Sequence, residues 1–580
     1  MGLIRELPEN VANKIAAGEV IERPASVVKE LVENSIDAGA TRIEVQLQEG
    51  GRKLVRVTDD GCGMDAEDVA MCFRSHATSK LRTSNDLFFI TTLGFRGEAL
   101  PSIGAVAQVR LVSRLRGTDA AHEVVVEGGK VAEPKVAGAP EGTTVEVRNL
   151  FFNTPARRKF LRSPRTELGH VLDVVTRIAL PHENIHFIVS NDGRTLVNAP
   201  PAEGRRARVA AFAGAELAEE LLDVEGGEGP LRVEGLAGPP ALSRGSTAMQ
   251  FIFLNRRYVR DRALSSAIRK AYEGLMPPGR HPVLFLFLQL DPREVDFNVH
   301  PTKIEVRFRQ GRRVYSCVLG ALRAALGASD LAPRLEPVPA SWDQVRRSPT
   351  PGSRPASPLP FSEPRVHLEE ARTQPRPVPT PPDPFAAAGT QAPFLQVHNS
   401  YILEETPEGF RVTDQHALHE RVLYEELLAR SEKAGVESQR LLMPEVVELT
   451  AAESAVAAEA IEALASFGFE IREFGERTVA VHAVPSLLAD CDPKELLHDV
   501  IEELNSEGEA RSVEAQRERL ARAVACKAAI KAGQRLRESE IEALLARREA
   551  LGERAETCPH GRPTSLVFSL EEMERRFKRK

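Results

Sequence analysis

The chain has 580 residues, a formal net charge of −7 and a hydrophobic content of 42%. This length is too great for one hydrophobic core and, at roughly one domain per 150 residues, predicts three or four domains. The six cysteines do not make a disulfide scaffold in a chain of this length, and no run of about twenty apolar residues indicates a membrane span. Charged residues occur too early for a secretory signal, so we expect a cytoplasmic protein with no membrane partner.

The first predicted helix lies within residues 29–40, KELVENSIDAGA. Glu30, Asn34 and Asp37 recur at i, i+4 and i+7, so a helix projects all three from one side, and Gly39 marks its end. By itself this pattern also describes the solvated face of an ordinary amphipathic helix. The segments that follow it favour a binding site.

Three glycine-containing segments come next. LVRVTDDGCGM predicts a strand that breaks at Asp59 and Gly63, an arrangement that suits close backbone approach to a flat polar ligand but also describes a tight turn. Residues 76–105 contain Gly94 and Gly97 and are compatible with a mobile lid whose backbone N–H groups cradle phosphates. EGTTVEVRNLF predicts another strand. Neither GxxxxGK[ST] nor GxGxxG occurs, so the two common nucleotide motifs do not explain these glycines.

Taken in order, ELVENSIDAGA, DDGCGM, GFRGEAL and GTTVEVRNLFFNTPARRKFL resemble the Bergerat-type ATPases shared by type II topoisomerases, Hsp90 chaperones, histidine kinases and MutL. FFNTPARRKFL and NVHPTKIEVRF resemble the MutL family of DNA mismatch-repair proteins in particular. The resemblance implies an α/β sandwich that binds ATP and Mg²⁺, with Glu30 as general base and Asn34 as the Mg²⁺ ligand. The residues it implies in ATP binding are Asn34, Asp59, Gly63, Thr78, Gly94, Gly97, Thr143 and Lys303.

The implied roles are chemically reasonable. Mg²⁺ takes one or two protein oxygens beside phosphate and water, and a carboxylate held in line with the γ-phosphate can activate the attacking water. Asp59 would accept from the adenine amino group, while Gly94 and Gly97 would form the phosphate lid. Lys303 would reach the γ-phosphate from a second domain, although outside its motif it reads as an ordinary turn lysine.

The second predicted unit alternates strands such as LRVEGL and HPVLFLFLQL with helices such as LSSAIRKAYE. Residues 251–313 carry 13 Lys and Arg against 6 Asp and Glu, a local balance of +7 in an acidic chain. This is either a solvated basic face or a surface for phosphates. The resemblance implies a ribosomal S5-like fold in which Arg262 contacts double-stranded DNA, with Arg269 on the same helix. No base-reading motif occurs, so binding should not depend on sequence.

A change in composition separates this unit from the rest. Residues 331–390 contain 15 of the 40 prolines and no sustained apolar periodicity, which is typical of a linker. We therefore divide the chain into a Bergerat-type ATPase domain at 1–205, an S5-like transducer and DNA-binding domain at 206–330, a disordered Pro-rich linker at 331–391 and an α/β C-terminal domain at 392–580.

The C-terminal part carries a second group of chemically active residues. His416 and Glu420 lie at i and i+4 of the predicted helix DQHALHERVLYEELLAR, a spacing that lets both bind one metal. Cys526 lies on another predicted helix, and Cys558 and His560 are two residues apart, on one side of a segment that we expect to be extended. These residues could form a zinc-type site, although isolated Cys and His are more often core residues.

DQHALHERVLYE, ACKAAIKA, CPHGRPT and the terminal FKR resemble the nuclease-type members of the MutL family, which nick DNA in a Mn²⁺-stimulated reaction and bind Zn²⁺. The resemblance implies dimerisation and endonuclease activity in this domain, with Asp414 and Glu420 catalytic. Spacing does not assign individual ligands to Zn²⁺ or Mn²⁺. The complete implied set is Asp414, His416, Glu420, Glu425, Cys526, Cys558, His560 and Arg579.

A short segment, QRLLMP, resembles the QxxLxP peptide by which nuclease-type relatives are thought to dock on the sliding clamp. Its anchors would be Gln439, Leu442 and Pro444. The alternative is that LLMPEVVEL is a core strand.

Three functions fit these patterns. The favoured one is a cytoplasmic, nucleoid-associated homodimer that hydrolyses ATP and nicks DNA when a MutS-type mismatch sensor and the clamp direct it. The second is an ATP-switched matchmaker whose metal site is structural. The third is another Bergerat-type enzyme, such as a topoisomerase or kinase, but no tyrosine cleavage domain or phosphoacceptor domain is apparent.

Overall fold

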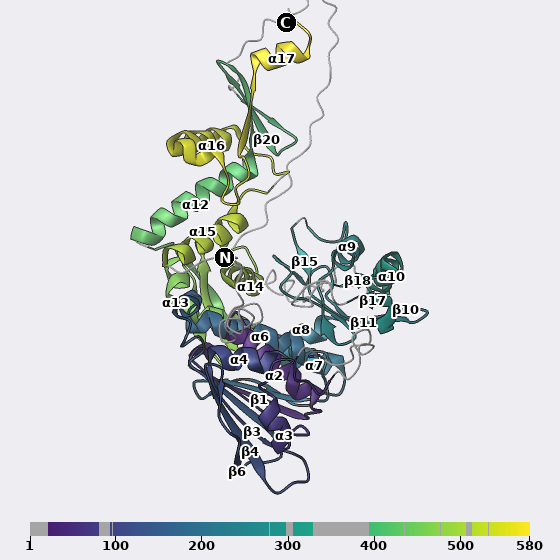
Figure 1. Cartoon of the computed structure of the whole chain (residues 1–580). Coiled ribbons are helices and arrows are strands. Elements are labelled where there is room, and N and C mark those ends of the chain that lie inside the picture. Colours follow the sequence, from purple (N-terminus) through teal and green to yellow (C-terminus); the bar gives the residue numbers. More distant parts are fainter. Residues whose placement is uncertain are drawn as a thin grey trace, which may run out of the picture.

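The computed structural model describes residues 21–80, 93–94, 97–277, 279–296, 306–328, 394–433, 435–475, 477–505, 513–531 and 533–579. The predicted linker and Lys303 lie outside these residues. The described chain is mixed α/β and forms a first unit, a second unit beside it and an elongated C-terminal unit (Figure 1). None of the described helices is both long and apolar enough to cross a membrane.

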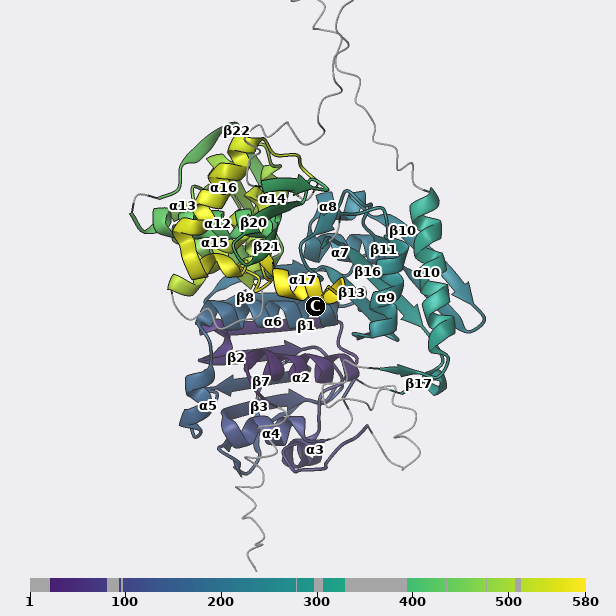
Figure 2. The same ribbon diagram turned by 90° about the horizontal axis from the view of Figure 1, so that it is seen from above.

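The first unit is a largely antiparallel sheet covered on one face by helices α2, α4 and α6 (Figures 1 and 2). The strand order is β5-β4-β3-β7-β2-β1-β8-β9, and β6 pairs with β4. Its strands are β1 (Arg42–Gln48), β2 (Leu54–Asp59), β3 (Gln108–Arg114), β4 (Ala121–Glu127), β5 (Lys130–Val131), β6 (Lys135–Ala137), β7 (Gly142–Arg148), β8 (His186–Asn191) and β9 (Arg194–Ala199). Its helices are α2 (Pro24–Asp37), α3 (Ala66–Met71), α4 (Ala99–Val106), α5 (Pro155–Phe160), α6 (Pro164–Ala179), α7 (Arg205–Ala213) and α8 (Ala215–Glu220).

Helix α2 has one buried and one polar side. Val28, Leu31 and Val32 are buried against the sheet, as the apolar i, i+3, i+4 pattern requires. The helix ends at Asp37, and Gly39 follows with a positive φ of 71° and donates its N–H to the carbonyl of Ile36. The predicted helix and its glycine end are therefore confirmed.

The second unit contains a five-stranded sheet of order β10-β11-β16-β13-β14. The strands are β10 (Leu222–Glu228), β11 (Leu231–Ala237), β13 (Gln250–Leu254), β14 (Arg257–Tyr258) and β16 (Leu284–Gln289), with smaller pairs β12 (Ser243–Arg244) and β15 (His281–Pro282), and β17 (Val295–Asp296) and β18 (Arg307–Phe308). The helices are α9 (Arg262–Ala271) and α10 (Gly311–Ala328).

Strand β16 explains why this sheet has an almost continuous apolar sequence. Leu284 and Leu286 join the core formed with α9 and α10, whereas Phe285 and Phe287 join the core of the first unit. Both faces of the strand are buried, so successive side chains are apolar although they point to opposite sides.

The C-terminal unit has two sheets joined by a long helix. The strands are β19 (Phe394–Val397), β20 (Tyr401–Thr406), β21 (Gly409–Asp414) and β25 (Ser565–Ser569) in one sheet, and β22 (Ser438–Glu448), β24 (Thr478–Pro485) and β23 (Glu470–Glu473) in the other. The helices are α12 (Gln415–Lys433), α13 (Ala451–Ser466), α14 (Pro493–Asn505), α15 (Val513–Ala528), α16 (Glu538–Leu551) and α17 (Leu570–Arg576).

Helix α12 belongs to both cores of this unit. Its first half buries Leu418 and Val422 with α16, and its second half buries Leu423 and Leu427 with α13, α14 and α15. Helix α13 also packs on α6 of the first unit, and α14 lies against β12 of the second (Figure 1). The C-terminal unit is thus docked on both other units.

Candidate ATP and metal sites

The polar side of α2 forms a cation-binding arrangement. The ammonium of Lys80 donates to Asn34 Oδ1 at 2.8 Å and to Asp37 Oδ2 at 2.5 Å. The backbone N–H groups of Leu93 and Gly94 donate to the Asp37 carboxylate at 2.9 and 3.0 Å. The amide and carboxylate therefore converge on a positive charge, and the Lys80 ammonium stands where the resemblance puts Mg²⁺.

Asp59, at the end of β2, forms the opposite wall. Its carboxylate accepts from the Ser35 hydroxyl at 2.7 Å, the Gly61 N–H at 2.9 Å and the Thr143 N–H at 3.3 Å. Burial raises the pKa of this carboxyl above its usual range, although the three donors oppose the shift. The arrangement fixes the orientation of an acceptor group beside the glycine turn, as recognition of a planar base requires.

Two glycines permit this close packing. Gly63 has a φ of 71°, and a Cβ there would lie 2.0 Å from the carbonyl oxygen of Arg114. Gly142 has a φ of 107°, and a Cβ would lie 2.0 Å from the carbonyl oxygen of Asp59. A side chain at Gly142 would displace the backbone that carries Asp59, and one at Gly63 would displace the backbone at Arg114, the end of β3.

Among the described residues, the other predicted nucleotide residues lie on α2 and between α3 and α4. Glu30 is on the same side of α2 as Asn34 and pairs with Lys29 at 3.2 Å. Thr78 is exposed and accepts the N–H of Lys80 at 3.2 Å. Gly97 packs against Ala77. Residues 81–92, which form most of the predicted lid between Lys80 and Gly94, lie outside the described residues.

Sequence reasoning missed Ser35 and Lys80. Ser35 is buried beside Asn34 on α2, and no periodicity distinguishes it from a core serine. Lys80 is two residues after Thr78 in a Ser- and Thr-rich segment, which was the only local signal for it. Both act through partners that are distant in sequence.

Four predicted metal ligands meet in the C-terminal unit. Ligand atoms of Glu420, Cys558 and His560 all lie within 4.8 Å of one another, and His560 Nδ1 is 3.0 Å from Glu420 Oε1. Cys526 on α15 hydrogen-bonds to Glu420. The fold therefore brings together residues from α12, α15 and the segment after α16, which the sequence could only suggest as possible common ligands.

The pKa shifts within this cluster are those expected where side chains are arranged to bind a cation. Burial opposes ionisation of Glu420, but His560, Cys526 and His416 lower the pKa of its carboxyl below the usual range. The Cys526 side chain is partly accessible, yet the surrounding protein and the Glu420 charge raise the pKa of its thiol to about 12. A divalent cation would relieve this repulsion, because it stabilises carboxylate and thiolate together.

The segment that holds Cys558 and His560 is a tight turn, so the prediction that it is extended was wrong. The N–H of Cys558 donates to the Arg562 carbonyl at 2.8 Å, the N–H of Gly561 returns to the Cys558 carbonyl at 2.9 Å, and Thr557 bridges to Pro563. Gly561 and Pro563 favour a turn over an extended run.

The remaining predicted nuclease residues lie at different distances from this cluster. His416 Nδ1 hydrogen-bonds to the Ile530 carbonyl at 2.8 Å, which orients the ring as protein contacts commonly orient metal-binding histidines. Asp414 accepts the N–H of Ala417 at 3.0 Å at the start of α12. Both residues lie at the N-terminal end of α12, within six residues of Glu420.

Glu425 and Arg579 are not brought into the cluster. Glu425 pairs with Arg421 and Arg554, each at 3.2 Å. Arg579 is exposed after α17, where its N–H donates to the Glu574 carbonyl. Within the described residues, neither side chain contacts Glu420 or His560.

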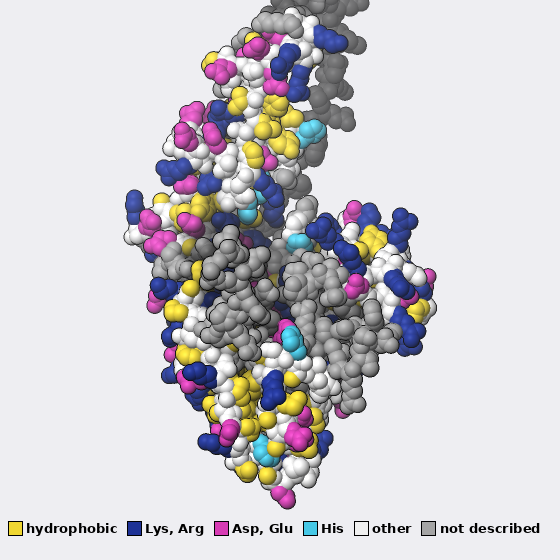
Figure 3. All heavy atoms as spheres, viewed as in Figure 1, with side chains coloured by type: hydrophobic (Ala, Val, Ile, Leu, Met, Phe, Trp, Pro, Cys, Tyr) yellow, Lys and Arg dark blue, Asp and Glu magenta, His cyan; other side chains and the backbone are white. Residues whose placement is uncertain are grey.

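The predicted DNA-contacting arginines lie on an exposed face of α9. Leu264, Ala267 and Ile268 are buried, which leaves Arg262 and Arg269 exposed. Figure 3 shows Lys and Arg side chains gathered on this part of the second unit. The structure thus presents them to solvent together, although it contains no partner.

The predicted clamp peptide lies in β22, at the edge of its sheet. Pairing with β24 shifts between Arg440 and Glu445, so the strand bulges over the peptide, as expected where proline removes a backbone donor. Leu442 has a relative exposure of 106% and Met443 of 79%. These residues are not part of a core strand, whereas the strand end at Val447 is buried.

The four-stranded C-terminal sheet has an apolar outer face. Its cross-strand pairs form the row Leu395, Leu403, Val412 and Leu566, and Phe410 stacks on Phe568 with ring centroids 5.0 Å apart. Directly paired residues point to the same face. The alternate face contains Ile402, which is buried beneath α12 and α16. Helices therefore cover one face and leave the other apolar and partly exposed.

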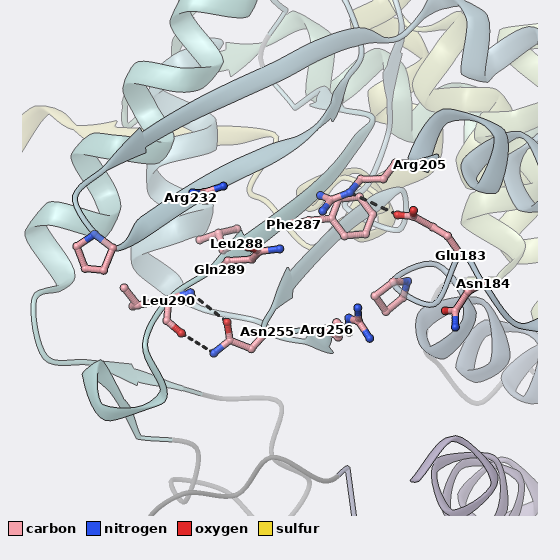
Figure 4. Close-up of a pocket in the computed structure, with 12 residues that line it drawn as sticks. Glu183, Asn184, Arg205, Arg232, Asn255, Arg256, Phe287, Leu288, Gln289 and Leu290 are labelled. Atoms are coloured by element: carbon pink, nitrogen blue, oxygen red, sulfur yellow. Dashed lines mark hydrogen bonds and ion pairs between the residues drawn. The ribbon is translucent and has the colours of Figure 1, made fainter. Parts of the chain in front are cut away.

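A groove of about 700 Å³ lies where the first and second units meet (Figure 4). Arg205 lies 4.2 Å above the Phe287 ring and pairs with Glu234 at 2.9 Å. Asn255 exchanges hydrogen bonds with both backbone groups of Leu290. The lining includes none of the residues predicted to bind ATP or metal, so we assign the groove to the junction between the two units.

Comparison with protein families finds three matches along the chain. Residues 21–139 match the histidine kinase-, DNA gyrase B- and HSP90-like ATPases, residues 209–327 match the DNA mismatch repair protein C-terminal domain, and residues 394–536 match the MutL C-terminal dimerisation domain. The first match contains Asn34 and Asp59, and the third contains α12, the helix that carries Glu420.

Whole-chain relatives agree with these matches. The chain is 42% identical to the DNA mismatch repair protein MutL of Geotalea uraniireducens over 99% of both sequences, and 44% identical to that of Azorhizobium caulinodans over 100% of both. It is also 27% identical to a solved Aquifex aeolicus MutL ATPase domain complexed with ADP, which covers 53% of this chain and 99% of that one with a TM-score of 0.38.

Proposed function

Because this chain belongs to the MutL family of DNA mismatch-repair proteins, we propose that it is a homodimeric, ATP-gated nicking endonuclease. The observation that carries the proposal is the occurrence in one chain of two sites, the Asp59 wall with its cation position and the Glu420, Cys558, His560 cluster. A mismatch sensor of the MutS type and the sliding clamp would direct the cut. We retain the domain division made from the sequence as part of this proposal.

At the first site, Asp59 accepts from the adenine amino group and is held in position by Ser35, Gly61 and Thr143. Asn34 would hold Mg²⁺, which would neutralise charge on the phosphates. Glu30, on the same side of α2, acts as general base on the attacking water. We keep Lys303 as the residue that senses the γ-phosphate, with the lid glycines closing over the nucleotide.

At the second site, the donor set fits zinc. Carboxylate, thiolate and imidazole are its usual ligands, and an ion needs them at about 2.0–2.3 Å, which ligand atoms within 4.8 Å of one another allow after slight contraction. A second ion, Mn²⁺, would supply Lewis acidity for phosphodiester hydrolysis. Asp414 and Glu420, both near the start of α12, would act on it. Arg579 lies outside the cluster in this structure, so its implied role near the developing charge would require the segment after α17 to approach the site.

The specific observation that favours the alternative, an ATP-switched matchmaker with a structural metal site, is the engagement of the acidic residues elsewhere. Asp414 caps α12 and Glu425 is held by two arginines. Carboxylates with structural partners need no catalytic role. The two functions make opposite predictions for DNA cleavage.

The deciding experiment is nicking of supercoiled plasmid in Mn²⁺ by the intact chain and by Asp414→Asn. Asp490→Asn serves as the matched control, because Asp490 is an exposed carboxylate of the same unit. The endonuclease function predicts nicking by the wild type and the control and none by Asp414→Asn. An absence of nicking by all three, with ATP and a sliding clamp present, would establish the matchmaker.

For the homodimer, we propose that the apolar outer face of the C-terminal sheet packs against the same face of a second copy. Leu566 and Val567 offer a matched test, since they have relative exposures of 56% and 54% but point to opposite faces. Leu566→Asp should shift the protein to a monomer in sedimentation equilibrium, and Val567→Asp should not. Equal effects of both variants would place the interface elsewhere.

A further inference from the structure

An acidic helix of the C-terminal unit covers a basic part of the second unit. Helix α14 carries Glu495, Asp499, Glu502 and Glu503 against one lysine, Lys494. It lies against β12 and the segment that follows it (Figure 1). The helix therefore brings a run of negative charge to the domain predicted to bind DNA.

The contact is centred on Arg280. Its Nη1 donates to both carboxylate oxygens of Asp499, at 2.9 and 2.8 Å. Its Nη2 donates to the Ser243 carbonyl at 2.6 Å and its Nε to the Ser243 hydroxyl at 3.1 Å. The second unit itself thus fixes the guanidinium, leaving one edge directed at an anion.

Glu502 makes the second contact one helical turn later. Its carboxylate accepts the Ser246 N–H at 3.2 Å and also the Ser246 hydroxyl. Arg244, which is buried in β12, attracts the same carboxylate. Burial nevertheless raises the pKa of Glu502 above its usual range. Ser246 and Arg244 therefore offset only part of the free-energy cost of burying this carboxylate.

Ser243, Arg244, Ser246 and Arg280 together form what we call the β12 site. A fixed guanidinium, a backbone N–H directed at a carboxylate, a hydroxyl and a second arginine are the groups that proteins use to bind phosphate oxygens. The site lies in the same unit as the predicted DNA face. Burial and the nearby charges of Arg269 and Arg280 lower the pKa of His281, the residue next to Arg280. Arg269 of α9 is thus close enough to influence His281, beside the groups that fit a phosphodiester.

We propose that the β12 site binds a backbone phosphate of duplex DNA and that α14 occupies it in this structure as a phosphate mimic. DNA and the C-terminal unit then compete for the second unit. The proposal rests on the DNA-binding part of the proposed function. Since docking is intramolecular, α14 is present at an effective concentration of about millimolar. The apparent Kd for DNA is then the intrinsic Kd divided by the fraction of chains that are undocked.

The test compares Glu502→Lys with Glu503→Lys in the full chain. The two residues are adjacent and the charge change is the same, but Glu502 contacts Ser246, whereas Glu503 pairs with Arg522 of its own unit. The measurements are the Kd for a non-specific duplex by fluorescence anisotropy and the sedimentation coefficient without DNA. Thermal melting checks that both variants fold.

The expected result is that Glu502→Lys binds duplex about three- to ten-fold more tightly than Glu503→Lys and sediments more slowly, because the released unit is more extended. Adding Arg280→Ala to Glu502→Lys should weaken binding and lower the slope of log Kd against log salt by about 1, as loss of one phosphate contact does. Both results together support competition at one site.

Equal affinities of the two lysine variants would overturn competition. Tighter binding by Glu502→Lys that Arg280→Ala leaves unchanged would show that α14 blocks access without occupying a phosphate site, which overturns the β12 assignment. Arg262→Ala keeps the two proposals distinguishable. If the wild type binds duplex and Arg262→Ala weakens it, DNA binding stands whatever α14 does; if no variant binds, both proposals fail.

Discussion

Replacing Asp59 by Asn tests the nucleotide site most directly. The carboxylate accepts three hydrogen bonds within the protein, from Ser35, Gly61 and Thr143, and is assigned a fourth from the adenine amino group. Asn keeps the shape but removes the charge and turns one oxygen into a donor. A hydrogen bond to a charged group contributes about 1.5–3 kcal/mol, so the Kd for ATP should rise about 10- to 150-fold.

The assay is isothermal titration of the intact chain with a non-hydrolysable ATP analogue and Mg²⁺. Because one internal donor also loses its acceptor, the free energy of unfolding of the variant should fall by about 1–3 kcal/mol. Binding must therefore be measured well below the melting temperature of the variant. Asp60→Asn is the matched control, since Asp60 is the neighbouring carboxylate and accepts from Thr41 and the N–H of Arg42, with none of the three donors that hold Asp59 among its partners in the described chain. An unchanged Kd for Asp59→Asn, or an equal loss in Asp60→Asn, would refute the assignment.

Three further outcomes are expected. Cys558→Ser should lower zinc bound per chain, measured by atomic emission after dialysis, with Cys491→Ser, a cysteine outside the cluster, retaining it. Leu442→Ala should abolish clamp binding in surface plasmon resonance while changing the free energy of unfolding by less than about 0.5 kcal/mol, because the side chain is fully exposed; a large loss of stability would indicate a core strand. Burial opposes ionisation of Glu453, but His498 and the Thr450 N–H lower its pKa to about 2, so its stabilisation is complete above its usual pKa of 4.5 and is lost as pH falls toward 2. In urea unfolding curves, Glu453→Gln should remove the part of the loss of unfolding free energy at low pH that comes from this group, about 3 kcal/mol. If the free energy of unfolding of the variant falls at low pH as it does in the wild type, the pairing of Glu453 with His498 is contradicted.

Local patterns predicted the elements that carry the sites. The i, i+4, i+7 spacing put Glu30, Asn34 and Asp37 on one side of α2, and the same logic put His416 and Glu420 on α12. Such patterns can be read from sequence because helix periodicity depends on near neighbours. They failed for the turn at Cys558, where the geometry of a loop depends on Gly561 and Pro563 and on the pairing of its two ends.

The sequence by itself thus determined the family, the helices and strands that bear the motifs, and which residue types were available for chemistry. Only the tertiary structure decided that Glu420 meets Cys526, Cys558 and His560, that Lys80 occupies the cation position, that one face of the C-terminal sheet stays uncovered, and that α14 lies on Arg280. The physical reason is that these contacts join residues tens to hundreds of positions apart. Their formation depends on packing and loop closure over the whole chain, which no local periodicity records.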